Sequence, residues 1–222
     1  MRIAFFGGSF DPPHCGHLAV ARAALDRLAL DRVLMAPVGN QPLKQNVATP
    51  SNFDDRLAMV RLATAADSSL HASDLDRPRA DGRPNYTLDS VLELRSTLVP
   101  DDSLFCLIGA DSFLTLRKWY RAEELLLLAP FIVAGRPGFT LEDAAAALPE
   151  NMRPGEPADG PGYRVLQISD DRGRQTVLYL MPDLQIDISA TMIRAALAEG
   201  ANAQTLLPQA VLEYIRARGL YR

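Results

Sequence analysis

Two of the three histidines in the chain, His14 and His17, stand three residues apart in the stretch GGSFDPPHCGH. Residues at this spacing share one helix face, so both imidazoles point the same way if a helix begins near His14. Free N–H groups and the helix dipole in that first turn attract anions. Gly7 and Gly8 let a ligand approach the backbone closely, and the Ser9 hydroxyl can donate to a phosphate oxygen. These groups predict a phosphate-binding site.

Zinc is an alternative ligand for the same stretch, because a His-Cys-x-His run offers three ligating side chains. Cys15 is adjacent to His14, however, and would point to a different side of the helix. A tetrahedral site also needs a further ligand, and the sequence has no second cysteine–histidine cluster to supply it. We therefore predict no metal site formed by the protein. A helix cap or a packed ring remains the simpler interpretation of either histidine taken alone.

The composition indicates the class of protein independently of any motif. The 222 residues are 48% hydrophobic and 23% charged, which is typical of a globular protein with a substantial core. The formal net charge of −4 gives no reason to expect nucleic acid or a membrane as partner. The sequence has two cysteines, no signal-peptide pattern and no long apolar run, so we expect a cytoplasmic protein.

Apolar runs alternate with helical patterns along the chain. The expected strands span 3–6, 33–37, 70–74, 104–109, 130–135, 163–169 and 176–181. The expected helices span 17–30, 51–66, 86–98, 190–200 and 209–219, the second of them capped by Ser51 or Asn52. Alternation of this kind predicts an α/β fold: a doubly wound, mostly parallel, Rossmann-like sheet with helices on both faces. Ligands of such sheets bind beyond the carboxyl ends of the strands, where GGSFDPPHCGH lies.

One segment, PENMRPGEPADGPG at 149–162, breaks this rhythm with four prolines and three glycines. A domain linker is one interpretation, but the chain that follows is too short to fold alone. We therefore expect a single domain over 1–222, with a surface loop excursion near 149–162.

Two motifs carry a resemblance to a known superfamily. GGSFDPPHCGH resembles the GG-[ST]-FDP-x-H-x-GH signature of nucleotidyltransferases related to class I aminoacyl-tRNA synthetases, and ISATMIR (188–194) resembles their ISSTxIR. This superfamily joins a nucleoside triphosphate to a phosphate-bearing acceptor and releases pyrophosphate. The resemblance implies a nucleotidyltransferase-type (HUP) fold.

Further segments resemble the nicotinate-nucleotide adenylyltransferase family, whose members make deamido-NAD from ATP and nicotinate mononucleotide. These are QPLK (41–44) for PPHK, NYTLDS (85–90) for S-Y-T-[VL]-D, IGADSFLTLRKWYR (108–121) for G-x-D…W, and AGRPG (134–138) for R-P-G. The chain departs from the family at Leu43, where histidine is frequent, and at Ala190, where serine is frequent. Neither departure removes a group that the chemistry needs.

The resemblance implies roles for individual residues. The implied catalytic residues, which would contact the phosphates, are His17, His14, Lys44 and Arg194. The implied ATP-binding residues are Gly7, Gly8, Ser9, Phe10, Gly16, Gly109, Asp111, Ser189 and Thr191. Mg²⁺ is expected to arrive with ATP, bound mostly by phosphates and water.

Four residues are expected to bind the acceptor: Tyr86, Thr87, Trp119 and Arg136. By resemblance Trp119 stacks on the pyridine ring. A nicotinate carboxylate would suit the free amides where Tyr86 and Thr87 open a helix, and Arg136 would reach the acceptor phosphate. Simpler interpretations stay open: a surface tryptophan, Thr87 or Asp111 as helix caps, and Arg136 in an exposed turn.

Rival functions also stay open at this point. The nearest is an adenylyltransferase for nicotinamide mononucleotide or phosphopantetheine. A non-catalytic nucleotide sensor would keep the phosphate site but is expected to lose a histidine, Lys44 or Arg194, and all are present. A dinucleotide hydrolase would need an acidic cluster that the sequence does not show. The partners expected are the small molecules ATP and nicotinate mononucleotide, with a homo-oligomer possible.

Overall fold

Eight strands and eight α-helices make up the described part of the computed structural model, which covers residues 1–44, 50–136, 138–184 and 186–222. The strands are β1 (Arg2–Gly8), β2 (Arg32–Pro37), β3 (Leu70–Ala72), β4 (Ser103–Gly109), β5 (Phe131–Ala134), β6 (Met152–Gly160), β7 (Tyr163–Asp170) and β8 (Gln175–Met181). The helices are α1 (Cys15–Leu28), α2 (Phe53–Thr64), α3 (Thr87–Ser96), α4 (Ala110–Phe113), α5 (Ala122–Leu128), α6 (Leu141–Ala146), α7 (Ala190–Ala198) and α8 (Gln209–Arg218). Two short 3₁₀ helices, η1 (Pro42–Lys44) and η2 (Leu116–Lys118), complete the elements.

All eight strands form one sheet in the order β3-β2-β1-β4-β5-β8-β7-β6. The pairs from β3 to β8 are parallel, and the pairs of β7 with β8 and with β6 are antiparallel. This arrangement confirms the predicted α/β, mostly parallel fold. Strand order reverses at β1, which lies between β2 and β4, so the loops after β1 and β4 leave the sheet on either side of a crevice.

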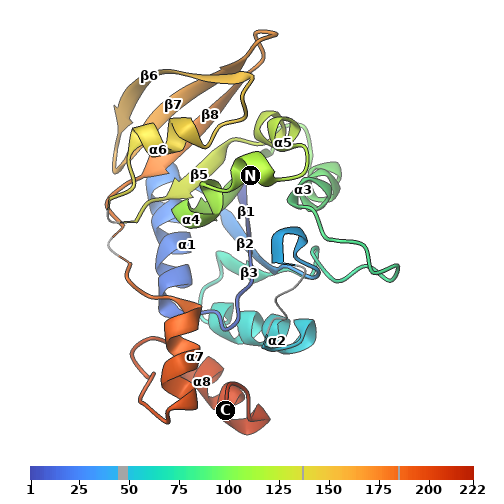
Figure 1. Cartoon of the computed structure of the whole chain (residues 1–222), viewed down its shortest axis with the longest axis vertical. Helices are drawn as coiled ribbons and strands as arrows, with labels where there is room; N and C mark the ends of the chain where they lie inside the picture. Colours follow the sequence, from blue (N-terminus) through green and yellow to red (C-terminus); the bar gives the residue numbers. More distant parts are fainter. Residues whose placement is uncertain (45–49, 137, 185) are drawn as a thin grey trace.

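Side chains that alternate along the strands contribute to a hydrophobic core on each face of the sheet. In β1, Ala4 and Phe6 belong to the core under α1, α2, α7 and α8, while Phe5 belongs to the core under α3 to α6. Successive side chains of a strand point to opposite faces, so a short apolar run serves both cores. Figure 1 shows α1 and the α3–α5 pair on opposite sides of β1.

The two ends of the long axis are occupied by different late segments. The β6–β7–β8 hairpins lie at one end, and α7 and α8 lie at the other, beside α2 (Figure 1). Tyr214 and Arg218 of α8 both bond to the Asp55 carboxylate of α2, at 2.7 and 3.1 Å. These bonds attach the C-terminal helix α8 to α2 in the N-terminal half of the chain. Every helix in the described ranges is too short or too polar to cross a bilayer.

The segment 149–162 differs from its prediction as a surface loop, because most of it is the edge strand β6. Seven of its nine residues are exposed, so the hydrophobic alternation that marks a half-buried strand is absent. Proline is compatible with an edge strand, and Pro154 and Pro157 flank a register shift in the pairing with β7. The helices α5 and α6 were also not predicted.

Candidate active site

The loop after β1 begins in an extended conformation and turns at an unexpected residue. Gly7 and Gly8 are the last residues of β1 and pair with Ala36 and Pro37 of β2. The left-handed residue is Phe10, with a φ of 46°. The chain therefore turns after the glycine pair rather than at it. Phe10 is buried and packs edge-on against Phe6 at 5.4 Å, which holds the turn against the sheet.

Gly16 is required by close packing at the start of α1. A Cβ at this position would lie 2.7 Å from Cγ2 of Ile186 and 3.0 Å from Nδ1 of His14. A larger residue would displace the Ile186 methyl and crowd the His14 ring. The glycine between the two histidines thus allows the His14 ring and Ile186 to pack against the start of α1.

The two histidines lie together, as their spacing predicted. His14 is the N-cap of α1 and His17 is its third residue. Their rings stack with centroids 3.7 Å apart, and the His14 backbone N–H donates to Nδ1 of His17 at 3.2 Å. A ring nitrogen that accepts a hydrogen bond bears no proton, so the proton of neutral His17 is on Nε2. That nitrogen is then a donor suited to an oxygen of a phosphate.

Both imidazoles are neutral at pH 7. Burial, with a smaller contribution from the positive charge of Arg136, lowers the pKa of His14 to about 4. Burial and the neighbouring His14 also lower the pKa of His17 well below its ordinary value. The buried Nδ1 of His14 has no hydrogen-bond partner within the described residues. A buried nitrogen without a hydrogen-bond partner is costly unless a ligand supplies that partner.

Arg194 reaches this loop from the other end of the chain. Its Nη1 donates to the carbonyl oxygen of Asp11 at 2.8 Å, and its Nη2 donates to the Thr191 hydroxyl at 3.2 Å. Ser189 caps α7 by accepting from the backbone N–H of Met192. The fold therefore brings the two motifs together, although they are more than 170 residues apart in sequence.

A cavity of about 820 Å³ opens at the carboxyl ends of the strands. Seven of the predicted site residues line it: Gly7, Gly8, Ser9, Tyr86, Thr87, Asp111 and Trp119. It therefore joins the loop after β1 to the segments predicted to bind the acceptor. A smaller cavity, of about 230 Å³, lies between α6 and the late strands and contains none of the predicted residues.

One side of the cavity, formed by Tyr86, Trp119 and Tyr120, is aromatic. Tyr86 caps α3, and its ring stacks on Tyr120 at 4.3 Å with an angle of 27°. Thr87 is the first residue of α3, so the interpretation of Thr87 as N-cap is wrong. Trp119 is half-buried, and its indole N–H donates to the Thr115 hydroxyl at 3.0 Å. Tyr120 lines the same cavity and was missed by the sequence analysis.

Asp111 and Arg136 form an ion pair at 2.7 Å. Both side chains are more than half exposed, so the pair contributes little to stability. Asp111 follows Gly109, which is the N-cap of α4, so Asp111 is not the helix cap. The family resemblance implies that Asp111 binds ATP and Arg136 the acceptor, whereas in the structure the two side chains contact each other.

The loop after β2 contacts the loop after β1, which we call the phosphate loop. Gln41 Nε2 donates to the Ser9 hydroxyl at 2.6 Å, and Leu43 lines the cavity. The prediction for Lys44 concerns a side chain that lies outside the described part of the structure. Gln41 was missed because a lone glutamine in a loop has no recognisable spacing.

A buried carboxylate inside the first motif was also missed. Asp11 is 1% exposed and accepts hydrogen bonds from the hydroxyls of Ser51 and Tyr221. Arg56, equally buried, donates to the Ser9 carbonyl at 2.9 Å. Asn52, and not Ser51, caps α2 by accepting from Asp55 N–H at 2.8 Å. A sequence shows residue types but not burial, so the cluster left no signal beyond the motif itself.

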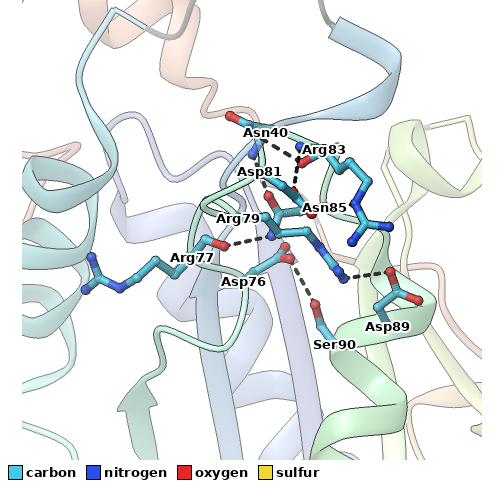
Figure 2. Close-up of polar contacts among 9 residues, drawn as sticks. All are labelled: Asn40, Asp76, Arg77, Arg79, Asp81, Arg83, Asn85, Asp89 and Ser90. Atoms are coloured by element: carbon cyan, nitrogen blue, oxygen red, sulfur yellow. Dashed lines mark hydrogen bonds and ion pairs between the residues drawn. The ribbon is translucent and has the colours of Figure 1, made fainter.

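A second buried carboxylate, that of Asp76, lines the cavity beside Asn85 and Tyr86. Figure 2 shows its polar contacts. Asp76 is 2% exposed and accepts from the Ser90 hydroxyl at 2.9 Å. Burial raises the pKa of Asp76 to about 6, although Ser90, Asn85 and nearby arginines oppose the shift. Asn85 bonds to the backbone of Asn40 and Arg77, each at 2.9 Å, and so joins the segment before α3 to the loop after β2.

The chemistry available here is recognition of anions and of flat aromatic rings. The Gly7–Ser9 segment lines the cavity and supplies backbone amides and a hydroxyl. The residues that line the cavity do not include His14, His17 or Arg194, which lie around the rest of the loop after β1. Aromatic faces supply stacking at the other end. Within the described ranges, no group of three or more histidine, cysteine or acidic side chains is arranged to bind a metal ion.

Comparison with known proteins places these features in a family. A model of the cytidylyltransferase-like family matches residues 5–196. A probable nicotinate-nucleotide adenylyltransferase from Solibacter usitatus is 37% identical over 221 residues, covering all of both chains. The corresponding protein from Chromobacterium violaceum is 40% identical over 223 residues, covering all of this chain and 99% of the relative.

Solved structures agree in fold. A Plasmodium falciparum nicotinic acid mononucleotide adenylyltransferase complexed with NaAD is similar with a TM-score of 0.71 and 18% identity, over 99% of this chain and 97% of the other. The same enzyme complexed with APC gives a TM-score of 0.69, over 99% and 96% of the two chains. At this level of identity the likeness concerns the fold alone.

Proposed function

Because the chain belongs to the cytidylyltransferase-like family, and within it to the nicotinate-nucleotide adenylyltransferases, we propose that it transfers AMP from ATP to nicotinate mononucleotide. The products are deamido-NAD and pyrophosphate. The two free cysteines, Cys15 and Cys106, suit a reducing compartment, and a cytoplasmic enzyme is part of this proposal.

The reaction is an in-line displacement at phosphorus. An oxygen of the acceptor 5′-phosphate forms a bond to the α-phosphorus of ATP, and the bond to the bridging oxygen of pyrophosphate breaks. The attacking oxygen is already anionic, so no protein base and no covalent intermediate are needed. Catalysis then consists of alignment and of stabilising charge on the leaving group.

The loop after β1, the start of α1 and the α7 motif with Arg194 form what we call the triphosphate end of the site. We propose that this end binds the phosphates of ATP. His17 would donate from Nε2 to an oxygen of the α- or β-phosphate, with the stacked His14 beside it. Arg194, held by the Asp11 carbonyl, would neutralise charge on the departing pyrophosphate with a planar fork of donors. The other proposed phosphate contacts are Gly7, Gly8, Ser9, Phe10, Gly16, Ser189 and Thr191, together with Lys44.

The nucleoside of ATP is proposed to lie along Gly109–Asp111. There the Asp111 carboxylate would accept from a ribose hydroxyl, either sharing or replacing its contact with Arg136. Mg²⁺ enters as part of the ATP substrate, with phosphates and water as its main ligands.

The acceptor is proposed to bind along the aromatic side of the cavity. Trp119 would stack on the pyridine ring, and the N-terminus of α3 at Tyr86 and Thr87 would receive the nicotinate carboxylate. A neutral carboxamide would gain less from that helix end, which favours the acid. Arg136 is proposed to reach the acceptor phosphate.

The observation that best supports this function is one cavity lined by part of the loop after β1 and by three of the residues proposed to bind the acceptor. Gly7, Gly8 and Ser9 line the same space as Tyr86, Thr87 and Trp119, so ATP and the acceptor can meet in one site. A phosphate site without a neighbouring acceptor site would suit a nucleotide sensor instead.

Pyrophosphate release tests the proposal directly. The protein is incubated with Mg-ATP and, in parallel, with nicotinate mononucleotide, nicotinamide mononucleotide or phosphopantetheine. We expect rapid release with the first and little with the others. Preference for another acceptor would contradict the roles given to Thr87 and Trp119. No release with any acceptor, despite measurable ATP binding, would favour a sensor.

A further inference from the structure

Two C-terminal tyrosines bond to buried carboxylates in the N-terminal half, but only one of these carboxylates belongs to the phosphate loop. The Tyr221 hydroxyl donates to Oδ1 of Asp11, which precedes the two prolines of the first motif. The Tyr214 hydroxyl donates to Oδ1 of Asp55, in α2. The first contact joins residues 210 positions apart in sequence.

The Asp11 carboxylate is saturated with donors that come from two remote segments. The Ser51 hydroxyl donates to the same Oδ1 as Tyr221, and the two hydroxyl oxygens lie 3.0 Å apart. The backbone N–H of Ser51 approaches Oδ2 at 3.5 Å. We call Asp11, Ser51 and Tyr221 the Asp11 anchor. Since Asp11 is 1% exposed, these protein donors replace its lost hydration.

Positive charge surrounds the anchor on two sides. Arg56 of α2 lies close enough to interact with both Asp11 and Tyr221. Arg194 of α7 interacts with Tyr221 and donates to the Asp11 carbonyl at 2.8 Å. The carboxylate and the carbonyl of one residue are therefore bound to different partners, and the side chain fixes the orientation of the peptide that Arg194 contacts.

We propose that Tyr221 is a positioning residue for phosphate transfer: through the Asp11 carboxylate, it fixes the carbonyl that aligns Arg194. This inference rests on the proposed function of Arg194. A misaligned arginine would still attract the triphosphate but would stabilise the leaving pyrophosphate less, so alignment affects the transition state more than the ground state.

The test compares Tyr221→Phe with the matched control Tyr214→Phe. Each substitution removes one hydroxyl that donates to a buried carboxylate and keeps the aromatic ring. We expect kcat to fall about tenfold in Tyr221→Phe, the size typical of a lost hydrogen bond to a charged group. The KM for nicotinate mononucleotide should stay within about twofold, and Tyr214→Phe should change kcat by less than about twofold.

A double mutant tests the route through Arg194. If Tyr221 acts by aligning the guanidinium fork, Tyr221→Phe should lower kcat by less than about twofold in an Arg194→Lys background, where the fork is absent. Independent, multiplicative losses would overturn this route. Equal effects of Tyr221→Phe and Tyr214→Phe would overturn the positioning role itself, because both would then report only the docking of the C-terminus.

Binding of inorganic pyrophosphate separates this inference from the proposed function. Calorimetry on the same variants needs no acceptor, so it remains informative if the wild-type protein fails to use nicotinate mononucleotide. We expect Tyr221→Phe to weaken pyrophosphate binding about threefold or more, and Tyr214→Phe to leave it unchanged. Unchanged pyrophosphate binding in Tyr221→Phe would refute the anchor, whether or not the wild-type protein uses nicotinate mononucleotide.

Discussion

The triphosphate end of the site, around the loop after β1, and the acceptor end, in the cavity, are built in different ways. At the triphosphate end, polar groups are bound by other polar groups: Arg194 by the Asp11 carbonyl and His17 by the His14 N–H. At the acceptor end, Tyr86 and Tyr120 stack on each other and Trp119 is half-buried. The first end is fixed by directional bonds, and the second presents flat faces that can adjust.

This difference suits the two tasks proposed for the ends. Charge stabilisation during phosphate transfer needs donors fixed before the substrate arrives, because reorganisation during the reaction would raise the barrier. Recognition of a pyridine ring needs area and one oriented charge, which stacking and a helix N-terminus supply. Substitutions at the triphosphate end should therefore lower kcat, and those at the acceptor end should raise KM.

The largest effect is expected for His17→Ala. Loss of the Nε2 donor should lower kcat by about two to three orders of magnitude, as removal of one preorganised donor typically does. The fold should persist, because the hydrogen bond that the His17 ring accepts from the His14 N–H is local to the first turn of α1. Steady-state kinetics and circular dichroism measure the two results. His71→Ala in β3 is the matched control and should retain full activity; near-normal turnover by His17→Ala would refute its role.

The two ends should also respond to pH with opposite sign. His14 has a pKa of about 4 in the folded protein against 6.5 ordinarily, so the unfolded chain takes up a proton first as pH falls. Its contribution to stability is complete above pH 6.5 and is lost between 6.5 and 4, by up to about 3 kcal/mol. Asp76, raised from 3.8 to about 6, makes the folded state lose stability as pH rises through that range.

Asp76→Asn separates these opposing terms. In the wild type the Asp76 contribution opposes the rise in stability with pH that the neutral histidines produce between pH 4 and 6. The variant lacks this opposing contribution, so its free energy of unfolding should rise more steeply with pH over the same interval. Urea unfolding at several pH values measures the slopes. Parallel curves for wild type and variant would show that Asp76 is not perturbed as described.

A smaller effect is expected for Trp119→Ala. Loss of one stacking face should raise the KM for nicotinate mononucleotide about tenfold, within the usual range for an aromatic–base contact. The KM for ATP should stay within about twofold. Trp119→Phe serves as the matched control and should recover part of the loss. A change confined to ATP affinity would count against the stacking role. It would also mean that the aromatic end does not serve the acceptor alone.

Whether a feature of the structure could be predicted from the sequence depends on how far apart its residues lie along the chain. The histidine pair and its helix were predictable because the groups are three residues apart and helix geometry alone brings them together. The contact between Arg194 and the first loop was anticipated only through the motif resemblance, since no local rule relates positions 183 residues apart. The sheet followed from apolar runs at regular spacing, whereas β6 did not, because its exposed edge carries prolines and charges.

Buried polar residues were the main omission at the site. Asp11 and Asp76 read in the sequence as ordinary loop aspartates, and only packing reveals that they are buried and bonded. Their partners, Tyr221 and Ser90, lie on other elements, so neither pair has a fixed spacing. The left-handed conformation of Phe10 likewise has no signal in the sequence, because only the packing of its ring against Phe6 in the core offsets the strain.

The smallest effect is expected where the two ends meet, at Arg136. Its exposed ion pair with Asp111 is expected to contribute less than about 1 kcal/mol, so Arg136→Ala should leave thermal stability nearly unchanged. The variant should instead raise the KM for nicotinate mononucleotide if Arg136 binds the acceptor phosphate, or alter only the KM for ATP if it merely holds Asp111. The charge of Arg136 also lowers the pKa of His14, so an NMR titration of the variant should show the His14 pKa moving upward. An unchanged His14 titration would mean that burial alone keeps this ring neutral, and that the charge at the acceptor end does not reach the histidines.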